Sequence, residues 1–375
     1  MEPVPPHHDP KADRAVARLA LWLGCFGFGG GYALIGYLQQ QVVTRRGWMD
    51  DQEFLRTVAV AQSVPGATAG NLLTLIGLRV SGWANALLCL ALFVLPSSLL
   101  LLLTAIFYDG ARHLGLVDEI FRGLAPAVVA IVLAVGYRLA RTLNRRWQPF
   151  VAAAAFAGVV SHWLGVLPVI LLTLLGSELA RRVRSRPALL AVPLPFLALV
   201  FVQISLSMFG GGYAMIAAID HELVGKLRWL SSSEFSDAIA LSQITPGPIA
   251  TAGAFIGYRL AGVAGAAVAT LAIFLPSYAL TLTASRILAR FGERPAVRAA
   301  LEALSATTLG LIFAASVSLA QSAGFFRAGP WTATGLSWAL AIAATGSLIL
   351  WRLNPLWVLA GAPLVRMAVL ALSRG

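Results

Sequence analysis

Long apolar segments separated by short clusters of charge dominate this chain. Apolar runs near residues 121–140, 165–180, 194–209, 263–285 and 331–351 approach or reach the roughly 20 residues that a helix needs to span a bilayer. Strands of a membrane barrel would alternate polar and apolar positions, and these runs do not alternate. The pattern therefore predicts an all-α polytopic membrane protein.

One order of motifs occurs twice along the chain. The stretch Phe28-Gly29-Gly30-Gly31-Tyr32-Ala33 returns, at a spacing of 181 residues, as Phe209-Gly210-Gly211-Gly212-Tyr213-Ala214. Further pairs keep this order, with one residue lost before the last: Glu53 with Glu234, Gln62 with Gln243, Pro65-Gly66 with Pro246-Gly247, and Arg79 with Arg259. Self-similarity of this kind indicates two homologous halves. We place them at residues 16–186 and 187–375, after a polar tail at residues 1–15.

Each half is predicted to contain broken helices. The glycine triplets loosen or break the first helix of each half, which we place at residues 16–41 and from about residue 194. The Pro-Gly pairs cannot continue a regular helix, because proline lacks the N–H group and restricts its predecessor. We expect two short pieces around each pair, at residues 53–64 with 67–80 and at residues 234–245 with 249–261. Neither piece is long enough to span a bilayer alone.

The remaining helices and their charged connections bear on topology. Further helices are expected at residues 83–107 and 121–140, followed by a pair of helices at residues 149–182, and again from about residues 263, 299, 331 and 355. The Arg-rich loop follows the helix at 121–140 in the first half but precedes the helix from 299 in the second. This shift favours inverted-topology repeats, with five spans per half and a broken pair that dips in and returns. Six spans per half would make the halves parallel, and both arrangements remain open.

Composition supports a membrane protein without obvious cofactor chemistry. The residues are 58% hydrophobic and 12% charged, and the net charge of +12 is typical of positive-inside signalling rather than of nucleic-acid binding. Cys25 and Cys89 both lie in apolar runs, which argues against a disulfide or a thiolate metal site. Met1 to Lys11 has no apolar core before a cleavage site, so we expect the first helix to act as the insertion signal.

The residues after each Pro-Gly pair are candidates for binding an anion. A new half-helix begins there, and its free N–H groups and positive dipole end favour negative charge. Paired interrupted segments in the halves of a repeat protein are the best sequence indication of a transporter binding site. Arg79 and Arg259 lie inside apolar runs and could add fixed positive charge there, or could equally extend to the membrane edge.

Each of the other repeated features has two interpretations. The glycine triplets either line the pathway or only permit close helix crossing. Gln62 and Gln243 either contact substrate or bind backbone groups freed by the break. Glu53 and Glu234 either carry coupling protons or cap helices, since Asp50 lies three residues before Glu53 and Ser231 three residues before Glu234.

Known enzyme motifs are missing from the sequence. The chain contains no G-x-x-x-x-G-K-[ST] loop for ATP, no G-x-S-x-G nucleophile and no H-E-x-x-H zinc motif. His113, His162 and His221 are scattered singly, which does not predict a metal site. We therefore expect secondary transport rather than an enzyme, with no cofactor.

In order and in duplicate, these motifs closely resemble the chromate ion transporter family. The matching pieces are Phe-Gly-Gly-Gly-Tyr-Ala, Gln-x-x-Pro-Gly and Ile-Gly-x-Arg-x-x-Gly. The resemblance implies export of chromate across the bacterial cytoplasmic membrane, driven by the membrane potential or the proton gradient, with sulfate as a competing anion. The expected partners are this small anion and the lipid bilayer, without nucleic acid, and a homodimer stays open.

The two halves depart differently from the family pattern. The second half has the fuller Thr245-Pro246-Gly247-Pro248, whereas Asn71 in the first half fills a position where the family often has Asn and the second half has Thr251-Ala252. The halves are therefore expected to contribute unequally. The complete set of predicted substrate-binding residues is Gly29, Gly30, Gly31, Gln62, Pro65, Gly66, Asn71, Arg79, Gly210, Gly211, Gly212, Gln243, Thr245, Pro246, Gly247 and Arg259, with Glu53 and Glu234 as candidate proton carriers.

Three other functions stay open at this point. Sulfate or another oxyanion could replace chromate, because sulfate nearly coincides with chromate in charge and shape. A membrane enzyme acting on a phosphate-bearing lipid could use the same half-helices to hold a head group, although the sequence offers it no cluster of catalytic carboxylates or histidines. A sensor or scaffold would have no need of doubled, broken helices.

Overall fold

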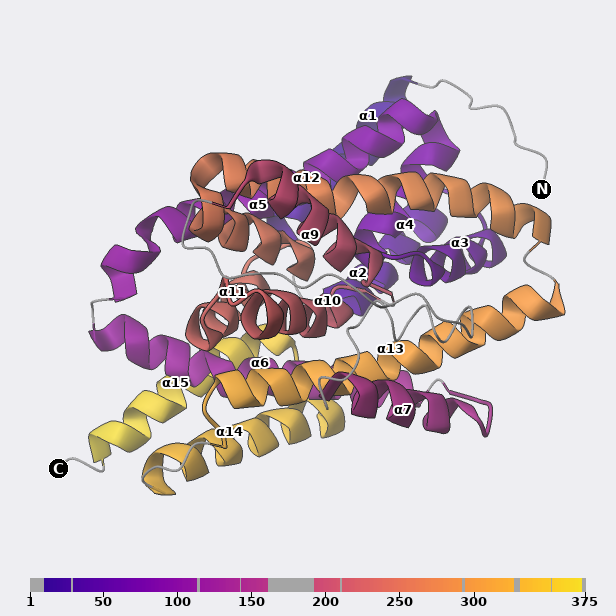
Figure 1. Cartoon of the computed structure of the whole chain (residues 1–375). Helices are drawn as coiled ribbons and strands as arrows, with labels where there is room; N and C mark the ends of the chain where they lie inside the picture. Colours follow the sequence, from indigo (N-terminus) through magenta and orange to yellow (C-terminus); the bar gives the residue numbers. More distant parts are fainter. Residues whose placement is uncertain are drawn as a thin grey trace. The chain divides into compact units, whose positions relative to one another are not determined.

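Helices form every regular element in the part of the chain that the structure describes. The computed structural model describes residues 10–27, 30–112, 115–141, 143–160, 192–209, 211–291, 294–326, 331–351 and 353–372. Within these ranges the ribbon shows helices joined by short connections (Figure 1). The predicted all-α class is confirmed.

The chain divides into two compact units that do not follow the two halves of the sequence. Unit 1 is drawn from Met1–Leu102, Val192–Met215 and Thr245–Ser305, and unit 2 from Leu103–Ala191, Ile216–Ile244 and Ala306–Gly375. Each unit therefore combines segments of both halves. Both Pro-Gly pairs belong to unit 1, whereas the helix that leads into the second pair belongs to unit 2.

The glycine triplet interrupts the first helix of each half. α1 (Pro10–Phe26) ends before the triplet and α2 (Gly30–Gln39) begins inside it, so the helix predicted at residues 16–41 is two helices. In the second half α9 (Leu194–Leu206) and α10 (Tyr213–Ile219) are separated at the aligned position. α2 and α10 each continue into a π-helical turn, η1 (Gln40–Arg45) and η2 (Asp220–Lys226). Short π-helical segments are frequent at functional sites.

The predicted pairs of short helices are present in both halves. α3 (Asp51–Ser63) and α4 (Thr68–Ser81) flank the first Pro-Gly pair. α11 (Ser232–Ile244) precedes the second pair, which is followed by the single turn η3 (Ile249–Thr251) and by α12 (Ala252–Phe291). At about 1.5 Å per residue, α3 and α4 are each roughly 20 Å long, shorter than the roughly 30 Å hydrocarbon core of a bilayer.

α3 and α4 form an antiparallel pair within unit 1. The two helices pack against each other, and the start of α3 meets the end of α4 through Glu53 and Arg79. The chain therefore turns back on itself at the break. This is the local geometry that the predicted dip and return requires, and the inverted arrangement of the halves stays a prediction.

A glycine with positive φ separates the second short helix from the next long one in both halves. Gly82 (φ 85°) lies between α4 and α5 (Trp83–Arg112), and the aligned Gly262 (φ 63°) bends α12 beside Ala261. Positive φ is readily accessible to glycine because it has no Cβ. α12 thus contains both the half-helix predicted at residues 249–261 and the helix predicted from residue 263.

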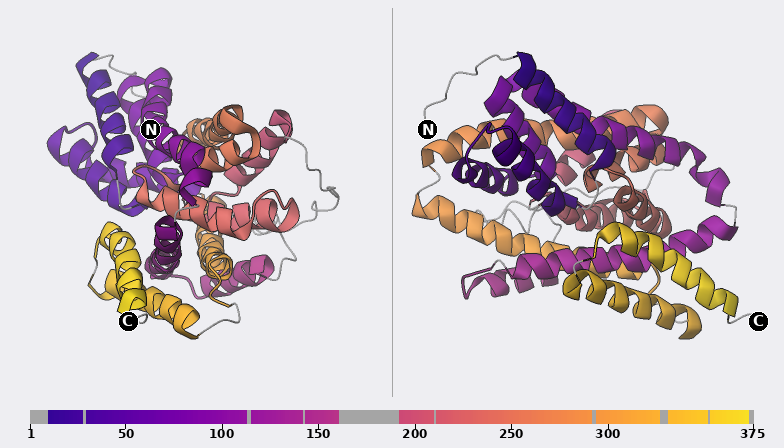
Figure 2. Two further views of the ribbon diagram at one scale, coloured as in Figure 1. Left: turned by 90° about the vertical axis from the view of Figure 1, so that its left-hand side faces the viewer. Right: turned by 180° about the vertical axis from the view of Figure 1, so that it is seen from behind.

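α6 (Gly115–Ala140) organises unit 2. α14 (Trp331–Leu350) and α15 (Pro355–Leu372) pack along it and against each other (Figures 1 and 2). α7 (Gln148–Val160) lies close to α13 (Pro295–Ser322), because a Cβ added at Gly310 would overlap the carbonyl oxygen of Ala152. The rest of the helix pair predicted at residues 149–182 falls at 161–182, outside the described residues.

Four helical stretches among the described residues are long and apolar enough to cross a membrane. They are Trp83–Ala111, Gly115–Ala140, Ile249–Ile287 and Ala299–Ser322. Four shorter apolar helices accompany them: Gln148–Val160, Leu194–Leu206, Thr334–Leu350 and Pro355–Val369. These helices support a multi-pass membrane protein.

Candidate functional site

The first Pro-Gly break is held by contacts from the opposite half of the sequence. Val64 is extended, and Gly66 has a φ of 130°. The N–H group of Gly66 donates to the carbonyl oxygen of Met208 at 2.8 Å. A Cβ at position 66 would overlap the hydroxyl oxygen of Ser277, so only glycine fits here without a shift.

The second break repeats these contacts with the halves exchanged. The N–H group of Gly247 (φ 98°) donates to the carbonyl oxygen of Gly27 at 3.0 Å. A Cβ at Gly247 would lie 2.5 Å from the hydroxyl oxygen of Ser97. Ser97 aligns with Ser277, and Gly27 aligns with Met208, directly before each Phe-Gly-Gly-Gly stretch. The two breaks are therefore a reciprocal pair within unit 1.

Asn71 makes the first break different from the second. Its side chain is buried, and its amide nitrogen donates to the carbonyl oxygens of Ala61 (3.2 Å) and Val64 (3.3 Å). Its amide oxygen accepts from the hydroxyl of Ser277 at 2.6 Å. These bonds satisfy carbonyl groups that the end of α3 leaves without helical partners. At the aligned position Thr251 instead bonds to the carbonyl of Pro248 at 2.7 Å.

Both half-helices begin with backbone N–H groups that have no helical acceptor. The first helical bond of α4 joins the N–H of Asn71 to the carbonyl of Ala67, and no acceptor among the described residues is found for the N–H groups of Thr68, Ala69 and Gly70. Ala67, the N-cap residue, has no side-chain acceptor to offer. Residues 67 to 70 are buried, so water does not easily replace the missing acceptors.

The start of η3 is similar. Its N-cap residue, Pro248, makes no side-chain capping bond, and the first helical bond joins Thr251 N–H to the Pro248 carbonyl at 3.0 Å. The N–H groups of Ile249 and Ala250 precede that bond. Unpaired N–H groups and the positive dipole end make a helix start suited to an anion.

The second glycine triplet lies between the two helix starts. A Cβ at Gly211 (φ 110°) would be 3.3 Å from the hydroxyl oxygen of Thr68, and one at Gly212 would be 3.3 Å from the Cβ of Ile249. Because neighbouring Cα atoms are about 3.8 Å apart, one Gly-Gly step contacts both starts. In the first triplet Gly30 and Gly31 begin α2, while Gly29 and Gly210 lie outside the described residues.

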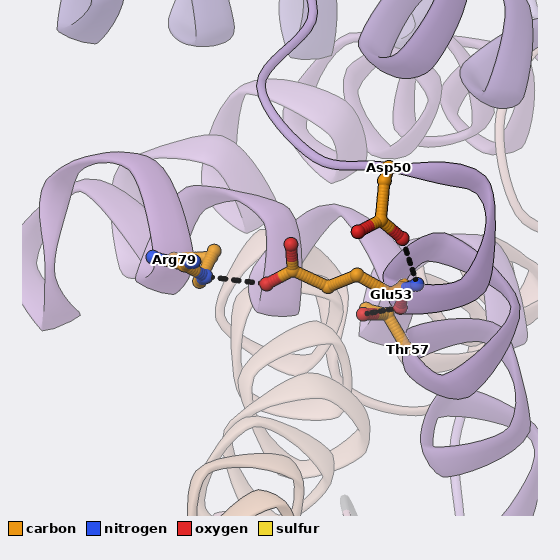
Figure 3. A network of polar contacts seen from close by, with 4 residues as sticks. All are labelled: Asp50, Glu53, Thr57 and Arg79. Carbon is orange, nitrogen blue, oxygen red and sulfur yellow. Dashed lines mark hydrogen bonds and ion pairs between the residues drawn. The ribbon is translucent and has the colours of Figure 1, made fainter. Parts of the chain in front are cut away.

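Arg79 is not close to the break. It lies in the last turn of α4, where its Nε atom is 2.6 Å from Oε1 of Glu53 (Figure 3). Eleven residues of helix, roughly 16 Å, separate Arg79 from Thr68. This geometry does not favour one anion shared by Arg79 and the N–H groups after Pro65, and a substrate-binding role of Arg79 stays a prediction.

Glu53 and Glu234, the two candidate proton carriers, both lie in the first turn of a capped helix. The N–H group of Glu53 donates to Oδ1 of Asp50 at 2.7 Å, and Thr57 donates to the carbonyl of Glu53 (Figure 3). Glu234 forms a reciprocal capping box with Ser231, with bonds of 3.0 and 3.2 Å. The predicted caps at Asp50 and Ser231 are confirmed, whereas the side chain of Glu53 pairs with Arg79, and proton binding by Glu53 and Glu234 stays a prediction.

The other predicted residues flank the breaks. Gln62 and Gln243 are half-buried in the last turns of α3 and α11, and the amide nitrogen of Gln243 is buried without a hydrogen-bond partner among the described residues. Thr245 and Pro246 form the connection after α11, Pro65 is buried in the first break, and Arg259 is half-buried in the first part of α12. No group of three or more potential metal ligands occurs in the described part of the chain.

The serines that pack against the breaks are not among the predicted site residues. Ser97 and Ser277 occur in a Leu-Pro-Ser motif that is itself repeated, so a signal was present. Nothing in the sequence showed that each serine packs against the break of the other half. Thr68 had no repeated counterpart and gave no signal.

Comparison with known proteins shows which family this chain matches. A family model described as Chromate transporter matches residues 14–184 and again residues 196–367. The "Probable chromate transport protein" of Synechococcus elongatus is 29% identical over 84% of this chain and 86% of its own. The "Chromate transport protein" of Cupriavidus metallidurans is 29% identical over 82% of each chain, and that of Pseudomonas aeruginosa 29% over 85% and 83%. No solved structure matches.

Proposed function

The chain belongs to the chromate transporter family, and we propose that it is a secondary transporter that exports chromate across the bacterial cytoplasmic membrane. The membrane potential or the proton gradient drives the export. The observation that carries this proposal is the pair of half-helix starts on either side of Gly211 and Gly212. The names of the relatives supply chromate as the substrate.

A dianion fits two helix starts better than one. Each helix N-terminus carries the equivalent of roughly half a positive charge, concentrated on its unpaired N–H groups. The N–H groups of Thr68, Ala69 and Gly70 and those of Ile249 and Ala250 would bind the oxygens of the anion. Glycine at positions 211 and 212 leaves space beside both starts, since a side chain there would approach Thr68 and Ile249.

Sulfate is the second candidate substrate. It has the same charge and nearly the same tetrahedral shape as chromate, so N–H groups that bind one will bind the other. Selection between the two anions then depends on the size of the site rather than on its charge.

Chromate uptake into everted membrane vesicles tests the proposed function. Vesicles that contain the protein should accumulate chromate, and vesicles from cells with an empty vector should not. An uncoupler should abolish the accumulation, and excess sulfate should reduce it. Absence of energy-dependent accumulation of either anion would sink the proposal.

Arg79→Gln should leave anion affinity close to that of the wild-type protein. The exposed ion pair with Glu53 lies at the far end of α4, and such pairs contribute about 0–1 kcal/mol to stability. We expect a Michaelis constant for chromate within about twofold of wild type, measured in the same vesicles, because a twofold change is only about 0.4 kcal/mol. The aligned Arg259→Gln provides the comparison. A tenfold weaker affinity in the Arg79 variant would place this guanidinium in the site.

A further inference from the structure

Arg366 is a buried charge near the end of α15. Only 5% of its surface is exposed, although the neighbouring Leu364 and Val365 are 66% and 50% exposed. An arginine near the end of a membrane helix usually extends its guanidinium to the membrane edge, where the charge stays hydrated. Arg366 instead lies on the face of α15 that the protein covers. A permanent charge buried in this way needs partners within the protein.

A close helix crossing places Arg366 beside α6. A Cβ added at Gly123 would overlap the Cα of Pro363, so the backbones of α6 and α15 nearly touch there. Glu119 lies one turn before Gly123 on α6, and Arg366 lies three residues after Pro363 on α15. The two helices are therefore antiparallel at the crossing, and the Nε atom of Arg366 is 3.2 Å from Oε2 of Glu119. All these residues belong to unit 2.

The hydrogen bond between Arg366 and Glu119 uses little of the guanidinium. Arginine carries five N–H groups, which can bind a carboxylate or another oxyanion at two points. Here Nε donates to Glu119, and the Nη1 and Nη2 groups have no acceptor among the described residues. The distance of 3.2 Å also exceeds the roughly 2.7–2.9 Å of a strong charge-assisted hydrogen bond. Glu119 therefore satisfies only part of this buried cation.

Glu119 is a carboxylate shared between two arginines. Its Oε1 atom is 3.9 Å from Nη1 of Arg122, which lies about one turn further along α6. Arg122 has a closer partner in Asp118, whose Oδ2 atom is 2.7 Å from the Nε atom of Arg122. The side chain of Glu119 is 30% exposed, so neighbouring atoms do not enclose it fully. A rotation toward Arg122 would keep Glu119 paired and would open the guanidinium of Arg366 to another anion.

We propose that Arg366 is a second binding site for a tetrahedral oxyanion, and that the carboxylate of Glu119 occupies this site in the present structure. The anion displaces Glu119 toward Arg122 and binds the N–H groups of Arg366 at two points. The site belongs to unit 2, whereas the helix starts after the two breaks belong to unit 1. The choice of an oxyanion as ligand rests on the proposed function, and the open donors of Arg366 do not.

A dianion is able to compete with Glu119 for this guanidinium. It carries one more negative charge than a carboxylate, and two of its oxygens can bind the planar fork of an arginine at once. Burial strengthens this attraction, because charges interact more strongly where water is excluded. The carboxylate, in contrast, uses one oxygen on one nitrogen of Arg366.

Equilibrium binding of labelled sulfate to the purified protein in lipid nanodiscs tests this site. The wild-type protein should bind sulfate in two classes, of which the class at Arg366 is the weaker because Glu119 competes for it. Ala67→Asp places a carboxylate at the start of α4 and should keep only this weaker class. Arg366→Lys should weaken the same class at least tenfold, because an ammonium group is a point charge without the planar fork.

Glu119→Gln should open the site. The amide keeps an oxygen that can accept from Nε of Arg366, but it has no charge with which to compete for the guanidinium. In the Ala67→Asp background, sulfate should therefore bind at least fivefold more tightly, and should raise the unfolding temperature further than it does without the Glu119 change. Arg138→Gln is the matched control, because Arg138 also lies on α6 but donates to the carbonyl of Leu348, and it should leave both classes unchanged.

The double variant Glu119→Gln/Arg366→Gln keeps the test decisive if Arg366→Lys fails to fold. It removes one positive and one negative charge together, so that no unpaired charge stays buried, and in the Ala67→Asp background it should bind no sulfate. Equal sulfate affinities of the wild-type protein, Glu119→Gln and the double variant would overturn the proposal, as would a wild-type protein with a single class that Ala67→Asp removes.

The same measurements separate this site from the proposed function. If Ala67→Asp keeps both classes and the Arg366 variants lose one, the anion site at the helix starts fails and the site at Arg366 stands. A wild-type protein that moves no chromate in vesicles would overturn the proposed function, and the binding of sulfate at Arg366 would still be decided by the nanodisc experiment. Absence of sulfate binding in the wild-type protein and in Glu119→Gln would overturn the site at Arg366.

Discussion

Gly66→Ala is expected to abolish chromate transport and to destabilise the protein. Alanine at a φ of 130° stores about 1–3 kcal/mol of backbone strain. Its Cβ would also overlap the hydroxyl of Ser277 and lie 3.0 Å from Oδ1 of Asn71, and such overpacking costs about 1–3 kcal/mol. Together these effects lower the free energy of unfolding by about 2–6 kcal/mol. They act directly at the start of α4.

Thermal unfolding in detergent and uptake into vesicles measure this effect. Gly36→Ala is the matched control, because Gly36 is exposed in α2 and an added Cβ would meet nothing within 4 Å. That change should be neutral or stabilise the protein by about 0.5–1 kcal/mol. The double variant Gly66→Ala/Ser277→Gly should regain part of the lost stability, because it removes the overlap but not the strain. A Gly66→Ala protein with wild-type unfolding temperature and transport would contradict the packing of this break.

Ala67→Asp is expected to stop transport without destabilising the fold, and Ala67→Asn should be much milder. Ala67 has the extended backbone of an N-cap residue but no capping side chain. Asp and Asn cap helices about equally well, each contributing about 0.5–2 kcal/mol relative to Ala. They differ in charge. Two unit charges 4 Å apart repel by about 4 kcal/mol at an effective dielectric constant of 20, so a carboxylate beside a bound dianion removes far more than a factor of ten in affinity.

Comparison of the two Ala67 variants separates the effect of the added charge on anion binding from the effect of helix capping. Uptake of chromate should fall at least tenfold further in Ala67→Asp than in Ala67→Asn, at equal protein levels and equal or higher unfolding temperatures. Asp50→Asn makes the same change of charge at the exposed start of α3 and should alter uptake little. Equal uptake by the two Ala67 variants would remove the start of α4 from the transport path.

Local rules were sufficient for much of the fold. Proline and glycine prevent a helix from continuing, whatever surrounds them, so both breaks were predicted to within a few residues of α3, α4, α11 and η3. Capping follows from the spacing of Asp50 and Glu53 and of Ser231 and Glu234. Whether a glycine triplet only loosens a helix or breaks it was harder to predict. Glycine loosens a helix by an amount that depends on packing, and here the triplets break both first helices.

Such local rules do not predict which residues far apart in the sequence come into contact. Arg79 follows the break by only 13 residues in the sequence, but the antiparallel pairing of α3 and α4 places this side chain beside Glu53. Asp237 is not a repeated position, because its aligned residue is Arg56. Its burial and its hydrogen bond from Tyr108, which is 129 residues away, follow from the tertiary structure alone.

The sequence by itself determined that this is a doubled, helical membrane protein with broken helices at matching positions. These features depend on apolar content, on backbone chemistry and on comparison of one half with the other, which need no knowledge of contacts. Only the tertiary structure decided that each break is closed by the opposite half, through Gly66 with Met208 and Gly247 with Gly27. A backbone N–H group at a break needs an acceptor, and many distant carbonyl groups could provide one. The folded arrangement alone selects which of them does.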